Sequence, residues 1–260
     1  MTGAIPELLK MCLIVCPLVF LAGFVDAVAG GGGLISLPAY LLAGLPAHQA
    51  AATNKTVNCM GTALAAWQYG RSRKVLLRAA LYACIGSTLG SYIGTRLALW
   101  IPDAVLGGIM VTALPCVAVF LSVNKGFGLD AAAKKQLSRR GEALLSFGIG
   151  IFIGCYDGLI GPGTGTFLIL AFTGLMGMDL LTSSGCAKFA NLASNITSMA
   201  VYLIGGKVVV LLAIPAAVCC MLGSFFGSRY ALRGGSKNVR RVMFVVLGLL
   251  FVKVLVSFFQ

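Results

Sequence analysis

Acidic residues and histidine are scarce in this chain, and their scarcity argues against several kinds of enzyme. The 260 residues include seven Asp and Glu together and a single histidine, His48. One histidine cannot supply a histidine-ligated metal site, and no nucleophile with a base beside it is evident. The nine cysteines show no CxxC or Cys/His spacing, so we expect them to pack among apolar residues. We therefore predict neither an enzyme nor a metal protein.

Signals for nucleotide and nucleic-acid binding are also missing. No Gly-Lys-Ser/Thr follows the glycine-rich stretches, and no heptad, low-complexity tract or nucleotide-binding domain is visible, so an ATP-driven mechanism would need a partner chain. The net charge of +13 could suggest nucleic acid. The basic residues lie mainly in predicted loops, however, where membrane topology already places them. We predict no nucleic-acid partner.

Hydrophobic residues dominate the composition and place the chain in the lipid bilayer. They make up 59% of the sequence, charged residues 10%, and the mean hydropathy is +0.97. Soluble domains contain about 45–50% apolar residues. At about 20 residues per spanning helix, the length allows roughly eight full helices plus short pieces. We predict a polytopic membrane protein with one membrane domain.

The sequence contains one pattern twice. Asp26 to Gly33 and Asp157 to Gly165 are glycine-rich interruptions of apolar sequence, and each is followed about thirty residues later by a lysine. A constant offset through polar, glycine and basic positions indicates an internal repeat. Equivalent positions are Gly23 and Gly154, Asp26 and Asp157, Gly30 and Gly161, Lys55 and Lys188, Asn58 and Asn191, and the segments 90–98 and 223–231.

Each half is predicted to contain five helical segments, the second of them short. The short segments, 33–45 and 164–177, reach only about 20 Å and cannot span a hydrocarbon core of about 30 Å alone. Broken helices of this kind lie where protein or a water-filled cavity covers them. The other predicted helices are 8–29, 48–69, 75–98 and 103–123 in the first half, and 142–160, 181–203, 207–230 and 240–259 in the second.

Loop charges predict that the halves have opposite orientations in the membrane. Short cytoplasmic loops collect Lys and Arg, and equivalent loops of the halves differ in this respect. We therefore predict two inverted repeats, residues 1–124 and 142–260, joined by a cytoplasmic linker, 125–141, with both termini periplasmic. The deciding basic residues are Arg71, Arg73, Lys74 and Arg78 in the first half, and Arg229, Arg233, Lys237, Arg240 and Arg241 in the second.

Two intramembrane lysines are the strongest candidates for substrate binding. Charge inside a membrane is costly and usually functional. Asn58 and Asn191 follow Lys55 and Lys188 by three residues and share their helical faces, and Asn195 extends the second face. Converging near the midplane, these groups would form a cationic, donor-rich pocket for a small oxyanion. Alternatively, the lysines extend to opposite interfaces as ordinary anchors.

The glycine breaks would complete this pocket. A half-helix that begins after such a break points free N–H groups and a positive dipole end inward, which suits an anion. In the alternative interpretation, the glycines only permit tight helix packing. The candidate binding residues of the breaks are Gly32, Gly33, Gly163, Thr164 and Gly165.

Asp26 and Asp157 are the only acidic residues well inside predicted spans. Each carboxylate could accept backbone N–H bonds as a cap of the helix break. Each could instead carry a coupling proton. An anion pocket disfavours a bare carboxylate, so the cap is the preferred interpretation.

The segments Ala22–Leu34, Ala52–Lys55 and Tyr156–Gly163, with Lys188 and Asn191, resemble the TauE/SafE family, also called the 4-toluene sulfonate uptake permease family, and most closely its YfcA-like branch. The resemblance covers essentially the whole chain. It implies a bacterial inner-membrane exporter or permease for sulfite, sulfonates or other small organosulfur anions, and it suggests no cofactor. Oligomeric state, substrate identity and direction stay undetermined.

Together, these observations predict an all-α secondary transporter that moves a small sulfur-containing anion by alternating access, with the proton gradient as a candidate driving force. An anion channel is the alternative. It would share the pocket but would show neither flux saturation nor trans-stimulation at modest gradients.

Overall fold

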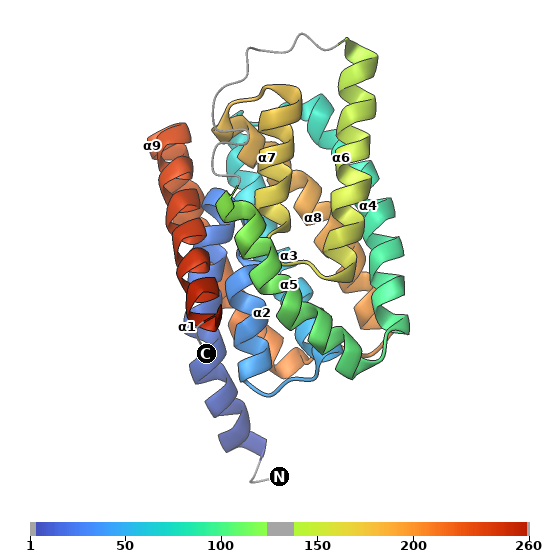
Figure 1. Cartoon of the computed structure of the whole chain (residues 1–260), viewed down its shortest axis with the longest axis vertical. Coiled ribbons are helices and arrows are strands. Elements are labelled where there is room, and N and C mark those ends of the chain that lie inside the picture. The colour runs from blue at the N-terminus through green and yellow to red at the C-terminus, as the bar shows by residue number, and fades with distance from the viewer. Residues whose placement is uncertain (1–3, 124–137, 259–260) are drawn as a thin grey trace.

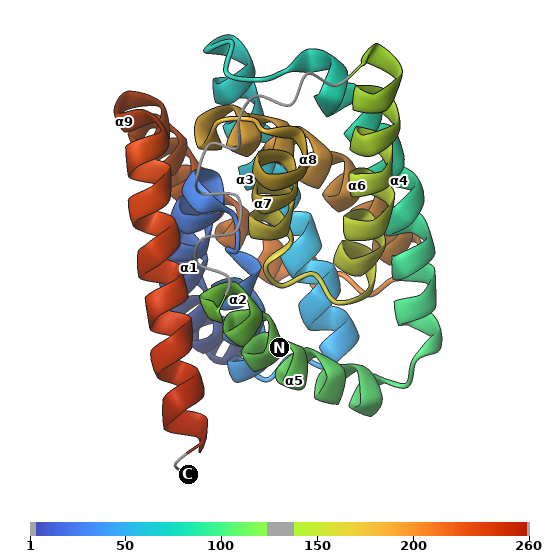
Figure 2. The same ribbon diagram turned by 45° about the horizontal axis from the view of Figure 1, so that its top comes forward.

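A computed structural model describes residues 4–123 and 138–258, and within them the chain is entirely helical (Figure 1). A second view shows the helices gathered into one bundle around the short α7 (Figure 2). The helices are α1 (Ala4–Ala29), α2 (Gly33–Leu42), α3 (Ala47–Arg71), α4 (Leu77–Trp100), α5 (Asp103–Val123), α6 (Arg139–Leu159), α7 (Thr164–Met176), α8 (Leu180–Ile204) and α9 (Val210–Phe258).

The predicted helices agree with this order. At the C-terminal end the sequence predicts two helices, 207–230 and 240–259, separated by a basic loop; α9 (Val210–Phe258) likewise consists of two helices, but they meet at a kink without a loop between them. A single non-helical residue, Gly235 with φ 60° and ψ −153°, divides α9 into two parts. The loop prediction was wrong because one glycine accommodates the whole change of direction. Most of the predicted linker, 125–141, lies outside the described residues, and α6 begins at Arg139.

The distribution of side chains is that of a membrane protein. Large apolar side chains are exposed on the outer surface, among them Trp100, Phe152 and Ile204, which are 81%, 79% and 88% exposed. Polar side chains lie in the interior instead, including the fully buried Lys188 and Ser91. A soluble protein rarely exposes so much contiguous apolar surface. Lipid is the environment that covers it.

Among the residues that the structure describes, three helical stretches are long and apolar enough to cross a membrane by length and composition: Pro6–Ala29, Arg139–Leu159 and Val210–Val245. α3 and α8 contain 25 residues each but are less apolar. The reason is that both carry polar residues on the faces they turn to the interior, including Lys55 on α3 and Lys188 on α8.

Helix packing in the two halves repeats at the level of single residues. α4 packs along α6, and α9 packs in the same way along α1. A Cβ added at Gly90 would overlap the carbonyl of Ile151, and one added at Gly223 would overlap the carbonyl of Phe20. These are equivalent positions of the internal repeat. Small residues here let helix backbones approach closely, as is typical inside membranes.

The two short helices begin near the middle of the molecule and run in opposite directions, α2 downward and α7 upward in Figure 1. The segment before α2 touches the first turn of α7: a Cβ at Gly30 would overlap the backbone of Gly165 and Thr166. The residue before α7, Gly163, has φ 82°, which a residue with a side chain rarely adopts. Glycine is therefore required where the two breaks cross and where α7 begins.

Candidate functional site

A pocket lies at the crossing of the two glycine breaks. The space between its lining atoms amounts to about 280 Å³, part of which is open to solvent. Both halves of the chain contribute to its lining. The lining residues are Asp26, Gly31, Gly33, Asn54, Lys55, Asn58, Asp157, Gly161, Gly163, Thr164, Gly165, Asn191 and Asn195.

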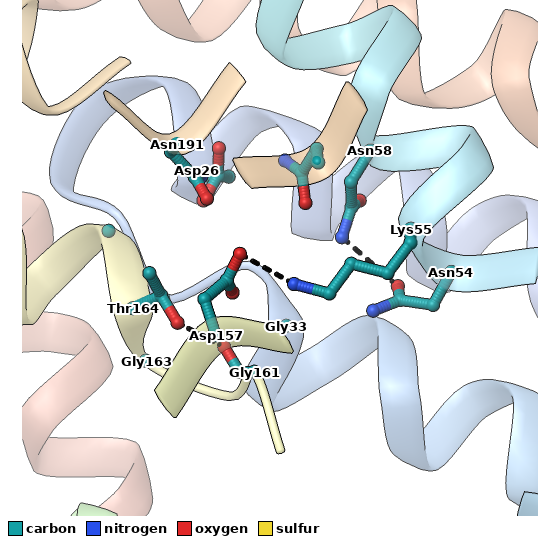
Figure 3. A pocket seen from close by; sticks show the side chains of 13 residues that line it. Asp26, Gly33, Asn54, Lys55, Asn58, Asp157, Gly161, Gly163, Thr164 and Asn191 are labelled. Atoms are coloured by element: carbon teal, nitrogen blue, oxygen red, sulfur yellow. Dashed lines mark hydrogen bonds and ion pairs between the residues drawn. The ribbon is translucent and has the colours of Figure 1, made fainter. Parts of the chain in front are cut away.

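An ion pair between the two halves forms one wall of this pocket. Lys55 Nζ of α3 lies 2.6 Å from Asp157 Oδ2 of α6, and the side chains are 7% and 3% exposed. Figure 3 shows the two side chains pointing toward each other, with Thr164 beside the carboxylate. Ser194 of α8 donates a hydrogen bond to the same Asp157 oxygen.

A second ion pair joins a lysine of the second half to an aspartate of the first half. Lys188 Nζ of α8 lies 2.7 Å from Asp26 Oδ2 of α1 and also donates to the main-chain oxygen of Asp26. The Lys188 side chain is 0% exposed and does not line the pocket, whereas Asp26 does. Each lysine thus pairs with the aspartate of the other half. The four formal charges at this crossing cancel.

Most of the predicted binding residues meet at the pocket. The two exceptions are Lys188, which lies behind Asp26, and Gly32, which lies outside the lining. Neither lysine extends to the outer surface of the protein, since both side chains are buried in ion pairs. The predicted residues that do line the pocket are Lys55, Asn58, Asn191, Asn195, Gly33, Gly163, Thr164 and Gly165.

The two aspartates are held by lysines in this structure. Within the described residues, no backbone N–H donates to the carboxylate of Asp26 or Asp157, as a helix cap would require. In the first turn of each of α2 and α7, one pocket-lining amide remains available instead. Gly33 and Gly165 line the pocket there, and neither amide has an acceptor in the described part of the chain. These N–H groups and the helix dipoles favour a negatively charged guest.

The sequence prediction missed Asn54. Its carbonyl oxygen accepts hydrogen bonds from Ser36 Oγ at 2.6 Å and from Asn58 Nδ2 at 3.1 Å, which fixes both amides on the pocket wall. The equivalent residue of the second half is Ala187, so a comparison of the two halves does not indicate this position. Its position next to Lys55 was the available signal.

His48, which has no repeat partner, serves a structural role at the start of α3. Its ring Nδ1 lies 2.5 Å from Asp103 Oδ1 and its Nε2 lies 3.1 Å from the Ala98 carbonyl oxygen. The Asp103 carboxylate also accepts the backbone N–H groups of Ala47 and His48. It therefore caps α3 from the neighbouring helix α5.

Comparison with known proteins adds the family. The family model described as "Sulfite exporter TauE/SafE" matches residues 15–254. The chain belongs to the TauE/SafE family. No solved structure matches the chain.

Curated relatives cover most of the chain. "Probable membrane transporter protein ORF9" of Sinorhizobium sp is 35% identical over 228 residues, which are 87% of this chain and 85% of the relative. A "Probable membrane transporter protein" of Haemophilus influenzae is 36% identical, covering 88% of each chain. "Probable membrane transporter protein YfcA" of Escherichia coli K12 is 32% identical, covering 90% of this chain and 86% of the relative. This TauE/SafE chain is therefore a membrane transporter.

Proposed function

We propose that this protein is a secondary transporter that moves a small sulfur-containing anion, such as sulfite or an organosulfonate, across the bacterial inner membrane. The observation that carries the proposal is the pocket where the starts of α2 and α7 meet beside Lys55. It combines an ammonium group, four side-chain amides and free backbone N–H groups, all of which are donors to an oxyanion. The family description supplies the sulfur chemistry.

Alternating access between two inverted repeats is the transport mechanism that we propose. Two features of the structure support it: α2 and α7 run in opposite directions from the middle of the molecule, and the glycine contacts of α4 on α6 recur between α9 and α1. In transporters of this design, the site lies at the interface of the repeats near the bilayer midplane, and one repeat moves against the other. The proposed cytoplasmic position of the linker and periplasmic position of both termini follow from the loop charges.

The proposed binding residues are the pocket-lining donors Lys55, Asn58, Asn191, Asn195, Gly33, Gly163, Thr164 and Gly165. Lys188 acts from behind the pocket, where it neutralises Asp26. Gly32 acts by shape, because a Cβ there would overlap the carbonyl oxygen of Ala22 across the turn between α1 and α2.

Flux measurements on the purified protein in liposomes test this function. We expect uptake of ³⁵S-labelled sulfite or thiosulfate to saturate with concentration and to accelerate when unlabelled anion is present on the opposite side. Linear flux without acceleration would instead establish an anion channel. No flux above that of empty liposomes, for any sulfur anion tried, would refute the proposal. Lys55→Ala is the matched variant, with flux expected at the background level.

A further inference from the structure

Adding an anion to this site poses a problem of charge. Lys55 and Lys188 are already neutralised by Asp157 and Asp26, so the site without substrate carries no net formal charge. A further negative charge, buried without compensation, would cost several kcal/mol even after relaxation of the surroundings. A cation must therefore enter with the anion, or a carboxylate must become neutral.

We propose that anion binding takes Lys55 away from Asp157 and that Asp157 receives one proton in the same event, while the Lys188–Asp26 pair stays intact. This inference rests on the proposed transport function. The proton comes from the buffered solution around the protein and binds to a carboxylate oxygen of Asp157; the ammonium group of Lys55 then pairs with the bound anion. Total charge in the site is unchanged for a monoanion.

Asp157 is suited to accept the proton because its surroundings can adapt. Its side-chain partners are Lys55 and the hydroxyl of Ser194. A hydroxyl can donate to a carboxylate or accept from a carboxylic acid, so Ser194 retains a hydrogen bond in either state. Lys55 faces the pocket and finds its new partner there.

Asp26 differs in this respect. Protonation of its carboxyl would leave Lys188, which is 0% exposed and lines no pocket, with only the main-chain oxygen of Asp26 as a described partner. No anion in the pocket could replace the lost carboxylate. Breaking a buried pair on one side only is strongly unfavourable. The two equivalent pairs therefore have different roles.

The other groups around Asp157 are compatible with a single proton site. Lys55 faces it from α3, Tyr202 from α8 and Tyr156 lies next to it in α6, while Asp26 of α1 lies across the pocket. α4 approaches at Gly158 with the hydroxyl of Thr95, and α7 contributes Thr164. The tyrosines are neutral near pH 7. Asp157 is thus the acidic group whose cation can move to a guest.

This coupling has a consequence for direction. If one proton accompanies each monoanion, the transport cycle moves no net charge across the membrane. The direction of net transport then depends on the anion and proton gradients together. The inward proton gradient of a bacterial cell then favours uptake. Export requires an outward anion gradient large enough to exceed it.

Calorimetry on the wild-type protein in detergent or nanodiscs tests the proposal, with methanesulfonate as the probe. It is the monoanion of a strong acid, so any proton taken up belongs to the protein. Titrations in buffers of different ionisation enthalpy should give about one proton per bound anion. Kd should rise about tenfold per pH unit where Asp157 is ionised in the free protein. Anion binding without proton uptake would refute the proton coupling but not the proposed transport function. If no sulfur anion binds, the proposed transport function itself is refuted.

Two variants assign the proton to a residue. Asp157→Asn should bind without proton uptake and with a Kd that no longer follows pH. The charge-neutral control, Asp26→Asn with Lys188→Met, should keep about one proton per anion. Loss of uptake in the control, or its retention in Asp157→Asn, would refute the assignment. Should either variant fail to fold, infrared difference spectra of the wild type decide: anion binding should produce a new carboxylic-acid band, and its absence would contradict the proposal.

Discussion

The two ion pairs at the centre of this protein are equivalent in sequence and unequal in their surroundings. Lys55–Asp157 forms a wall of the pocket, whereas Lys188 is sealed behind Asp26. A buried ion pair contributes little net stability when intact but costs much when one partner is removed. Two pairs at equivalent sequence positions therefore differ in access: the lysine of one pair lines the pocket, and the lysine of the other is closed off from it.

The largest expected effect is on the free energy of unfolding, which should fall more when one ion pair loses its carboxylate than when the other does. Asp26→Asn leaves the fully buried Lys188 without a counter-charge, so we expect a loss of about 3–5 kcal/mol in the free energy of unfolding. Asp157→Asn should cost clearly less, because Lys55 borders the pocket and water can reach it. Thermal unfolding of the detergent-solubilised variants measures the difference.

The control for this comparison is the double variant Asp26→Asn with Lys188→Met. Removing both charges should recover most of the stability lost in Asp26→Asn, because no unpaired charge remains. If Asp157→Asn proves as destabilising as Asp26→Asn, the distinction between the pairs is wrong.

The next effect tests whether the helix contacts of the halves are equivalent. Gly94→Ala would place a methyl group on the carbonyl of Cys155, and Gly227→Ala would place one on the carbonyl of Phe24. Each should destabilise by about 1–3 kcal/mol through overpacking, and by similar amounts. Gly148→Ala in α6 is the matched control, since a Cβ there meets no atom within 4 Å. A neutral result at one of the two contact positions would show that the packing is not repeated.

The smallest expected effect concerns the N-terminal caps of α3 and α8, which the two halves provide in different ways. Asp103 of α5 caps α3 from outside, while α8 is capped by its own Asp179, which accepts the N–H groups of Leu181 and Thr182 at 3.0 Å. Burial alone would raise the pKa of Asp179, but the hydrogen bonds from Thr182, Leu181 and Ser236 outweigh it and hold the pKa below the ordinary value. Asp179→Ala should cost about 1 kcal/mol near neutral pH.

The sign of the pH dependence follows from that lowered pKa. The ionised carboxylate of Asp179 stabilises the fold at pH values above the unfolded-state pKa, and this contribution is lost as the pH falls through the folded-state pKa. The difference in melting temperature between wild type and Asp179→Ala should therefore shrink below about pH 4. A difference that grows on acidification would contradict the capping role.

Much of this architecture could be predicted from the sequence because it depends on local signals. Glycine runs in apolar sequence predicted the breaks before α2 and α7, and hydropathy predicted the other helices. The shared offset of Lys55 with Lys188 predicted a cationic pocket; the structure brings both lysines to one polar centre, but Asp157 and Asp26 neutralise them there. The basic loop expected within residues 231–239 was wrong, because charge pattern alone does not distinguish a loop from a helix that turns at one glycine, Gly235.

The arrangement of the site could not be predicted in the same way. Which aspartate pairs with which lysine depends on how the halves cross, and nothing in the spacing of Asp26 and Lys188 specifies it. The unequal burial of the two lysines depends on side-chain packing around α8. The role of Asn54 was missed because the repeat provides no counterpart for it.

A structure of the protein with thiosulfate, determined by cryo-electron microscopy with a rigid antibody fragment bound, tests the central claim most directly. The account predicts anion density between Lys55 Nζ and the first turn of α7, with Asp157 displaced from the lysine and Lys188 still on Asp26. Density for the anion at any other place, or a saturated protein in which Lys55 remains paired with Asp157, would contradict it.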